Sequence, residues 1–229
     1  MLIHGLQKMT LLDYPGRVAC TVFLGGCGLR CPFCHNAGLI DGSAAPVMDS
    51  EELVAFLKKR RGLLDGVAVT GGEPLLRDLS PLLSEIKALG YPVKLDTNGT
   101  RPDRLRSLID RKLVDYVAMD IKNSPERYAE TVGLAEFDLG PVYASIALLL
   151  SGGTDYEFRT TVVEEFHSRE SFLSIGEMIR GARKYFLQPF TGRDGVPSPG
   201  LHAPAPAVIE TYAKAVEPFV SSVSIRGMQ

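Results

Sequence analysis

Apolar strand-like segments alternate with amphipathic helical segments along almost the whole sequence, and this alternation restricts the chain to few folds. It is typical of βα units, whose strands pair in parallel to form one sheet. Glycine-rich or polar stretches such as GGEP, DTNG, DIK and PFTGRDG follow the strand-like segments. About six such units fit the chain, fewer than a closed eight-unit barrel needs. We therefore expect an α/β fold, a partial, open (β/α)6 TIM-like barrel with parallel strands.

The boundaries of the expected elements follow from periodicity and from turn residues. Strands are expected at 17–25, 66–72, 92–99, 115–122, 155–163 and 184–190, and a further extended piece at 220–227. Helices are expected at 50–60, 78–90, 101–113, 171–183 and 206–219, with helical segments between 125 and 152. Ser50 is the expected N-cap of the helix at 50–60, and Gly90 is expected to end the helix at 78–90.

Length and composition limit the domain organisation and the kinds of partner. A chain of 229 residues with 45% hydrophobic content can bury one sizeable core, so residues 1–229 are expected to form one domain. Residues 1–16 would precede the first barrel strand. A formal charge of −2 without a basic run argues against nucleic acid as a partner. Neither a secretory signal nor an apolar run of membrane-spanning length is visible.

Three cysteines in GGCGLRCPFCHN carry the strongest functional signal. Cys27, Cys31 and Cys34 lie at CxxxCxxC spacing on a short glycine-rich segment. Three thiolates on one loop can hold three irons of a [4Fe–4S] cluster and leave the fourth iron open to a small molecule. An open iron indicates chemistry rather than electron storage alone. Because three of the four cysteines belong to this segment, a reducing cytoplasm suits the chain better than a disulfide scaffold.

A structural zinc site or a set of buried thiols is the alternative interpretation of these cysteines. Structural zinc takes four nitrogen or sulfur ligands, so His35 or Cys20 would have to be the fourth. His35 follows Cys34 directly, which makes chelation of one tetrahedral ion awkward. Cys20 lies in the apolar run VACTVF, where a free cysteine usually packs as a small hydrophobic residue.

The cysteine spacing resembles the signature of the radical S-adenosylmethionine (SAM) superfamily, and nearly the whole chain resembles glycyl-radical-enzyme activases. The expected open barrel is the radical SAM core. This resemblance implies that SAM binds the open iron through its amine and carboxylate, and that one electron cleaves it to a 5′-deoxyadenosyl radical. It makes Cys27, Cys31 and Cys34 the cluster ligands and the catalytic residues. The cofactor-binding residues that it implies are Phe33, Gly71, Gly72, Glu73, Asp96, Asp120, Lys122 and Arg159.

The matched motifs give these residues separate roles. TGGEP resembles the GGE motif, in which backbone groups bind the SAM amino group, and LDTNG resembles the next strand end of the site. Asp120 and Lys122 in MDIK resemble the D-x-K motif, and Arg159 is expected to meet the SAM carboxylate or ribose. SAM carries an ammonium, a carboxylate and a sulfonium, so groups of both signs suit it. Phe33 is expected near adenine or in the packing of its loop.

Two further expectations concern ions and imidazoles. Asp96 and Asp120, with nearby carbonyl groups, are expected to be able to hold a monovalent cation, since oxygen ligands suit such an ion. Related activases commonly carry a histidine after an aromatic residue at the end of the sixth strand, but QPFTGRDG has Thr191 there. His35, in the CHN pattern typical of activases, is expected to donate a hydrogen bond to the cluster.

The segment IHGLQKMTLLDYPGRVACTVFLGGC resembles the start of activating proteins for anaerobic ribonucleoside-triphosphate reductase. The resemblance therefore implies an oxidoreductase that abstracts a hydrogen atom from a glycine Cα of a partner glycyl radical enzyme. A reduced flavodoxin or ferredoxin would supply the electron. Two alternatives stay open: a radical SAM enzyme acting on a small molecule, like 7-carboxy-7-deazaguanine synthase, and a non-catalytic iron–sulfur or zinc protein.

Overall fold

The computed structural model describes residues 1–227, and one eight-stranded sheet runs through it in the order β10-β9-β8-β7-β6-β5-β3-β2. Neighbouring strands are parallel except β2 and β3, which are antiparallel. The sheet does not close, because β2 and β10 each have one neighbour. The strands are β2 (Gly5–Thr10), β3 (Ala19–Leu24), β5 (Gly66–Gly71), β6 (Val93–Thr97), β7 (Tyr116–Asp120), β8 (Asp155–Val162), β9 (Tyr185–Pro189) and β10 (Val223–Ile225). The expected strands and the open (β/α)6 arrangement are confirmed.

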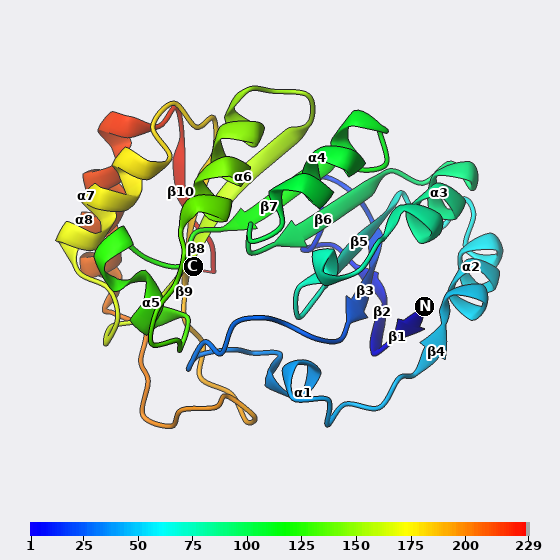
Figure 1. Cartoon of the computed structure of the whole chain (residues 1–229), viewed down its shortest axis with the longest axis horizontal. Coiled ribbons are helices and arrows are strands. Elements are labelled where there is room, and N and C mark those ends of the chain that lie inside the picture. The colour runs from blue at the N-terminus through cyan, green and yellow to red at the C-terminus, as the bar shows by residue number, and fades with distance from the viewer. Residues whose placement is uncertain (228–229) are drawn as a thin grey trace.

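Helices cover the outer side of the curved sheet, and the blue segment that follows β3 crosses its inner side (Figure 1). Within residues 1–227, none of the helices combines the length and apolar composition that crossing a membrane requires. The α-helices are α1 (Ala37–Ile40), α2 (Ser50–Lys59), α3 (Ser80–Ala88), α4 (Pro102–Asp110), α5 (Tyr128–Thr131), α6 (Gly140–Leu150), α7 (Arg169–Met178) and α8 (Pro206–Val216). Short 3-10 helices are η1 (Pro74–Leu76), η2 (Pro125–Arg127) and η3 (Glu217–Phe219).

The parallel strands are apolar on both faces because side chains of the barrel interior and of the outer helices both cover them. In β5, Val67 and Ala68 point to opposite faces and both are buried, and the same holds for Val117 and Ala118 in β7. This burial explains why the strands are nearly continuous apolar runs and not alternating patterns. Polar side chains in the carboxyl-terminal halves of several strands, such as Thr70, Asp96 and Asp120, face the pocket described below.

The start of α2 differs from the expectation by one residue. Asp49, and not Ser50, is the N-cap: its carboxylate accepts hydrogen bonds from the amides of Glu51 and Glu52, both at 2.9 Å. The Glu52 side chain in turn accepts a hydrogen bond from the Asp49 amide at 3.0 Å. This reciprocal capping box satisfies more donors than a serine at the next position would, since Ser50 already belongs to the helix.

The first residues form strands that the sequence did not predict. β2 pairs with β3 along the edge of the main sheet, and β1 (Leu2–Ile3) forms a separate antiparallel pair with β4 (Met48–Asp49). β2 is an edge strand with mostly exposed or half-exposed side chains, so it lacks the apolar run that marks the inner strands. The N-terminal segment is therefore part of the sheet.

A buried carboxylate at the start of β8 connects the strand to the last part of the described chain. Glu157 is fully buried and accepts a hydrogen bond from the Tyr116 hydroxyl at 2.7 Å. The Arg226 guanidinium binds the same carboxylate with two hydrogen bonds, of 2.6 and 2.7 Å. Burial alone would raise the pKa of Glu157, but these donors outweigh it and hold the pKa below its ordinary value.

Replacing Arg226 by alanine should destabilise the protein by about 2–3 kcal/mol, because it leaves the Glu157 carboxylate buried without its cation. The double variant Arg226→Ala/Glu157→Gln should recover at least half of that loss. Arg183→Ala is the control, since Arg183 pairs with Asp155 at 3.8 Å on the surface and should cost less than about 0.5 kcal/mol. Urea unfolding measures all three. Equal losses of unfolding free energy in Arg226→Ala and Arg183→Ala would contradict this role of Arg226.

Candidate active site

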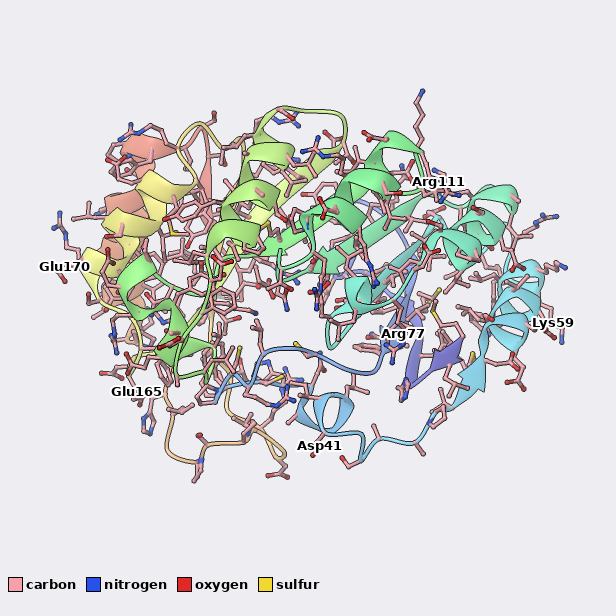
Figure 2. The ribbon with its side chains drawn as sticks, viewed as in Figure 1. Asp41, Lys59, Arg77, Arg111, Glu165 and Glu170 are labelled. Atoms are coloured by element: carbon pink, nitrogen blue, oxygen red, sulfur yellow. The ribbon has the colours of Figure 1, made fainter. Side chains whose placement is uncertain are left out.

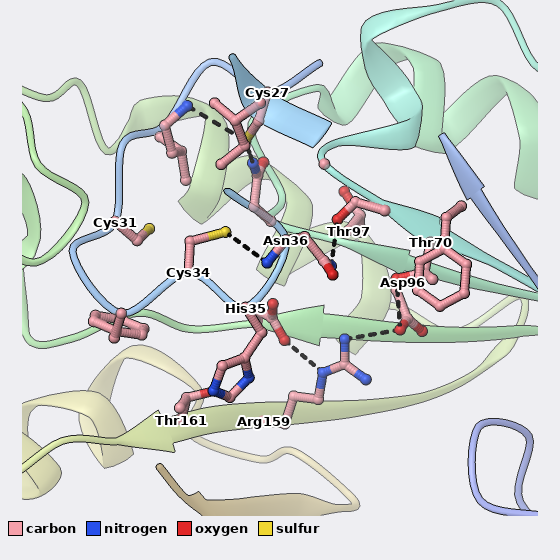
Figure 3. Close-up of a pocket in the computed structure, with 18 of the residues that line it drawn as sticks. Cys27, Cys31, Cys34, His35, Asn36, Thr70, Asp96, Thr97, Arg159 and Thr161 are labelled. Carbon is pink, nitrogen blue, oxygen red and sulfur yellow. Dashed lines mark hydrogen bonds and ion pairs between the residues drawn. The ribbon is translucent and has the colours of Figure 1, made fainter. Parts of the chain in front are cut away.

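The segment between β3 and α1 places the three cysteines around one pocket of about 410 Å³ (Figure 3). Cys31 is buried, and Cys27 and Cys34 are half-buried. Backbone amides of the same segment donate to two of the sulfurs: Leu29 to Cys27 Sγ and Asn36 to Cys34 Sγ, each at 3.4 Å. Amides aimed at sulfur stabilise a thiolate and not a thiol, so the segment suits negatively charged sulfur.

Burial raises the pKa of Cys31 to about 11 and also raises the pKa of Cys27 above its ordinary value. Without bound positive charge, both side chains are therefore neutral thiols at neutral pH. A coordinated metal deprotonates its thiol ligands, so metal loading would release protons.

Three cysteines around one pocket are the donor set of a cluster with one open iron. Within the described residues 1–227, no group of three or more His, Cys, Asp or Glu side chains is placed to hold a single metal ion. A [4Fe–4S] cluster asks for a different arrangement, in which each cysteine meets its own iron around a shared volume. Cys27, Cys31 and Cys34 line the same pocket, so they fit the three-cysteine donor set of such a cluster.

Neither residue considered as a fourth zinc ligand is in place. Cys20 is fully buried in β3, where burial raises its pKa to about 12, and it is not among the residues that line the pocket. His35 turns towards β9: its Nε2 lies 2.8 Å from the Thr191 carbonyl oxygen, and its ring stacks on Phe190 with 5.4 Å between centroids. The hydrogen bond of His35 therefore goes to the backbone after β9 and not to a cysteine. An imidazole thus lies beside the position where Thr191 replaces the expected histidine.

The Gly-Gly pair at the end of β5 lies directly against the start of the cysteine segment. Gly72 N donates to Leu24 O at 2.8 Å, and Glu73 N donates to Gly26 O at 2.7 Å. Gly71 has φ of +125°, which favours glycine, and a Cβ on Gly72 would lie 2.1 Å from the Gly26 carbonyl oxygen. Both glycines are thus required by close backbone approach.

The Glu73 side chain points away from the pocket and holds the end of β6. Its Oε1 accepts hydrogen bonds from the Leu75 amide at 3.0 Å and the Thr97 hydroxyl at 2.9 Å, and its Oε2 accepts one from the Asn98 amide at 2.7 Å. Burial raises the pKa of Glu73 to about 7 although these donors oppose the shift. The carboxylate is therefore a buried clamp between two strand ends.

Five charged side chains form an ion-pair ladder across the ends of β6, β7 and β8. Arg159 is its centre: Nη2 donates to Asp96 Oδ2 at 3.0 Å, and Nε donates to Asp120 Oδ1 at 2.5 Å (Figure 3). Lys94 pairs with the other oxygen of Asp96, and Lys122 Nζ donates to Asp120 Oδ2 at 2.8 Å. Neighbouring parallel strands in register place these residues side by side.

The members of the ladder stabilise one another's charged forms. Burial would raise the pKa of both aspartates, but Arg159 together with Lys94 or Lys122 holds each pKa below its ordinary value. The same carboxylates raise the pKa of Arg159 and Lys122 against the effect of burial. Both carboxylates and the cations of Arg159 and Lys122 therefore persist at neutral pH. A monovalent cation bound by Asp96 and Asp120, as the sequence suggested, would compete with side-chain cations that already neutralise both carboxylates.

The remaining expected residue, Phe33, is buried, lines the pocket and packs on Phe166 at 5.8 Å between ring centroids. The pocket therefore brings together every expected cofactor-binding residue except Glu73. Those that line it are Phe33, Gly71, Gly72, Asp96, Asp120, Lys122 and Arg159.

Three side chains support the cysteine segment, and of these sequence reasoning named only Asn98, as part of the LDTNG motif. Asn36 Nδ2 donates to the Gly71 carbonyl at 2.9 Å, and Asn98 Nδ2 donates to Cys27 Sγ at 3.7 Å. His4 Nδ1 accepts a hydrogen bond from the Gly25 amide at 3.1 Å. The CHN and DTNG motifs contain both asparagines, but no local pattern links His4 to Gly25. Sequence reasoning also missed residues that line the pocket from β2, from β3, from the turn between them and from the segment after β9. They include Gln7, Asp13, Thr21, Phe23 and Arg193.

The sequence of this chain is similar to those of several known proteins. The model of the radical SAM superfamily matches residues 21–169. A protein of Methanocaldococcus jannaschii named "Putative glycyl-radical enzyme activating enzyme" is 30% identical over 98% of this chain and 95% of its own length. The pyruvate formate-lyase-activating enzyme of Clostridium pasteurianum is 34% identical over 53% of this chain and 52% of its own.

Two further similarities concern a different activity and the fold. The 7-carboxy-7-deazaguanine synthase of Koribacter versatilis is 31% identical over 64% of this chain and 62% of its own. The crystal structure of a domain of pyruvate-formate lyase-activating enzyme from Bacteroides vulgatus superposes with a TM-score of 0.58 at 16% identity, over 71% of this chain and 99% of that domain. At this identity the superposition supports the fold alone.

Replacing Gly72 by alanine should prevent the cysteine segment from packing against the end of β5, because the new Cβ would overlap the Gly26 carbonyl oxygen. We expect iron and sulfide content after anaerobic reconstitution to fall at least fivefold. Gly28→Ala is the matched control on the same segment, since a Cβ at Gly28 meets nothing within 4 Å. Normal iron and sulfide loading of Gly72→Ala would contradict this role.

The raised pKa of Glu73 predicts a pH-dependent difference in stability between the wild type and Glu73→Gln. Between the unfolded pKa near 4.5 and the folded pKa of about 7, the folded wild type binds one proton more than the unfolded chain. Wild-type stability should therefore fall, relative to the variant, by about 1.4 kcal/mol per pH unit as pH rises through this window. Urea unfolding of both proteins at pH 5, 6 and 7 measures it, and parallel pH profiles would refute it.

Proposed function

This chain belongs to the radical SAM superfamily, and we propose that it is an oxidoreductase that activates a glycyl radical enzyme. The family implies SAM and a [4Fe–4S] cluster as cofactors. Bound there, they would supply a one-electron cleavage of the SAM sulfonium, the chemistry needed to remove a hydrogen atom from a glycine Cα. The single observation that carries the proposal is that the three cysteines and four members of the ion-pair ladder border the same pocket; these four are Asp96, Asp120, Lys122 and Arg159.

The cysteines are proposed to hold the cluster with one iron left open. Their segment begins against the Gly-Gly pair, so the backbone of Gly71 and Gly72 would face the SAM amino group. Glu73 would act by position: its buried carboxylate fixes the turn after β5 and the end of β6.

The ladder is proposed to orient the remaining polar groups of SAM. Asp96 and Asp120 offer carboxylate edges to donors, and Lys122 and Arg159 offer cations to the SAM carboxylate and the ribose oxygens. Because each side chain is already held by its neighbour, little side-chain ordering would be needed on binding, which favours affinity. Phe33 would close the adenine end of the pocket.

The substrate class follows from the relatives. The similarity to the M. jannaschii protein spans nearly the full length of both chains, which supports a protein substrate with an exposed glycine. We propose anaerobic ribonucleoside-triphosphate reductase as that substrate on the resemblance of the opening segment, with residues 1–229 as one radical SAM domain. A reducing cytoplasm would keep the three thiols available for iron, and a flavodoxin or ferredoxin would supply the electron.

A small-molecule substrate is the second candidate, and the similarity to 7-carboxy-7-deazaguanine synthase supports it. Gln7, Asp13, Thr21 and Arg193 line the pocket beyond the ladder and could hydrogen-bond a heterocycle. A heterocyclic substrate should stimulate SAM cleavage by itself. An activase should need a glycine-containing protein or peptide.

The proposal is tested by anaerobic reconstitution with iron and sulfide, followed by SAM and dithionite. We expect 5′-deoxyadenosine from the wild type and at least a hundredfold less from Cys31→Ala, while Cys20→Ala should keep most of the wild-type yield because Cys20 lies in the core. Addition of a glycyl radical enzyme should then give a protein-centred radical signal in EPR. No cleavage by the fully loaded protein would overturn the enzymatic function and favour a metal-binding protein. Cleavage without a glycyl radical, stimulated by a heterocycle, would favour the second candidate.

A further inference from the structure

A groove of about 300 Å³ between η1, the start of α3 and the outer side of α4 is bordered by three arginines. Arg77, Arg104 and Arg111 are all exposed, and their guanidinium groups are free of carboxylate partners within 4 Å in the described part of the chain. Figure 2 labels two of them, Arg77 nearer the middle of the view and Arg111 at its upper right. The chain as a whole carries a net charge of −2, so this face differs in sign from the protein average.

The groove contacts the cysteine segment directly. The Arg77 guanidinium donates a hydrogen bond to the Gly25 carbonyl, and its Nη2 lies 3.7 Å from the place where a Cβ of Gly26 would be. Gly25 and Gly26 immediately precede Cys27. From the other side of the groove, Arg104 Nη1 donates to the Leu75 carbonyl at 2.8 Å.

Cys27 is the cysteine on the side of this face. Its sulfur accepts the hydrogen bond from Asn98, and Asn98 is separated from the start of α4 by three residues. Two short connections therefore lead from the arginines to the same sulfur, one through Arg77 and Gly26 and one through Asn98. A protein that docks on this face would approach the cluster from its Cys27 side.

The charge pattern favours a protein surface over a polyphosphate. Asp78 and Asp103 border the same groove, and Asp78 accepts a hydrogen bond from the Ser80 amide at 2.9 Å. Nucleic-acid binding relies on phosphate neutralisation by clustered cations, which carboxylates between the arginines would oppose. Alternating charge with a positive excess suits a protein partner with an acidic, mixed surface, and such complementarity mainly speeds association.

We propose that this arginine groove is the docking surface for an acidic electron-transfer protein of the flavodoxin or ferredoxin class. The inference rests on the proposed function, because it assigns the partner that reduces the cluster. In the encounter complex the reduced donor loses one electron and the cluster gains one; no atom or proton is transferred between the proteins. The electron enters on the Cys27 side.

The test compares two double variants of the cluster-loaded protein with the same change in charge. Arg104→Glu/Arg111→Glu reverses the charge of two of the arginines that border the groove. Arg106→Glu/Arg169→Glu reverses two exposed arginines that do not border the groove, one on α4 and one at the start of α7. Reduced flavodoxin is the probe. Binding is measured by titration at low and moderate salt, and cluster reduction by stopped-flow absorbance.

The groove variant should bind flavodoxin about tenfold more weakly and show a smaller salt dependence, and its cluster should be reduced correspondingly more slowly. Reduction by dithionite should be unchanged. The control variant should differ from the wild type by less than about threefold. Equal losses in both variants, or none in either, would overturn the docking proposal, as would tighter binding of a single-stranded oligonucleotide than of flavodoxin at the groove. If dithionite reduces the cluster but no 5′-deoxyadenosine forms, the proposed function fails while the docking result stands separately.

Discussion

The structure depends on the close contact between the backbone at the end of β5 and the backbone that follows β3. Two hydrogen bonds, Gly72 N to Leu24 O and Glu73 N to Gly26 O, continue the pairing of these strands beyond their ends. They carry the cysteine segment across the inner side of the sheet rather than away from it. The contact is possible only because neither Gly71 nor Gly72 has a side chain. The cysteine segment and the glycine motif at the end of the next strand are thus one backbone structure.

Buried charge imposes a second constraint on the pocket. A charged side chain removed from water needs a partner, and each member of the ladder has one on a neighbouring strand or two residues away on its own. Glu73 is the exception: hydrogen-bond donors hold it without a cation, and burial raises its pKa to about 7. A cationic ligand in the adjoining pocket would favour the ionised form of Glu73, because opposite charge lowers a carboxyl pKa.

The sequence predicted the parallel strands, the open barrel and the residues around the pocket because each depends on a local pattern. Apolar runs such as GVAVTGG mark inner strands, and strand ends of a parallel sheet meet at one edge. β2 was missed because an edge strand with one exposed face lacks such a run, and Asp49 was missed because Ser50 beside it is also a good cap. The direction of the Glu73 side chain, the turn of His35 to Thr191 and the contact of His4 with Gly25 join distant residues, so no local pattern contains them.

Arg159 is the member of the ladder that touches two carboxylates, whereas Lys94 and Lys122 each touch one. A lineage that replaced Arg159 alone would leave Asp96 and Asp120 facing each other across neighbouring strands without the cation between them. Related sequences should therefore change this arginine only together with at least one of the two aspartates. Either lysine can be replaced alone with a smaller loss of stability. The ladder should therefore make three positions on three separate strands change together among related sequences.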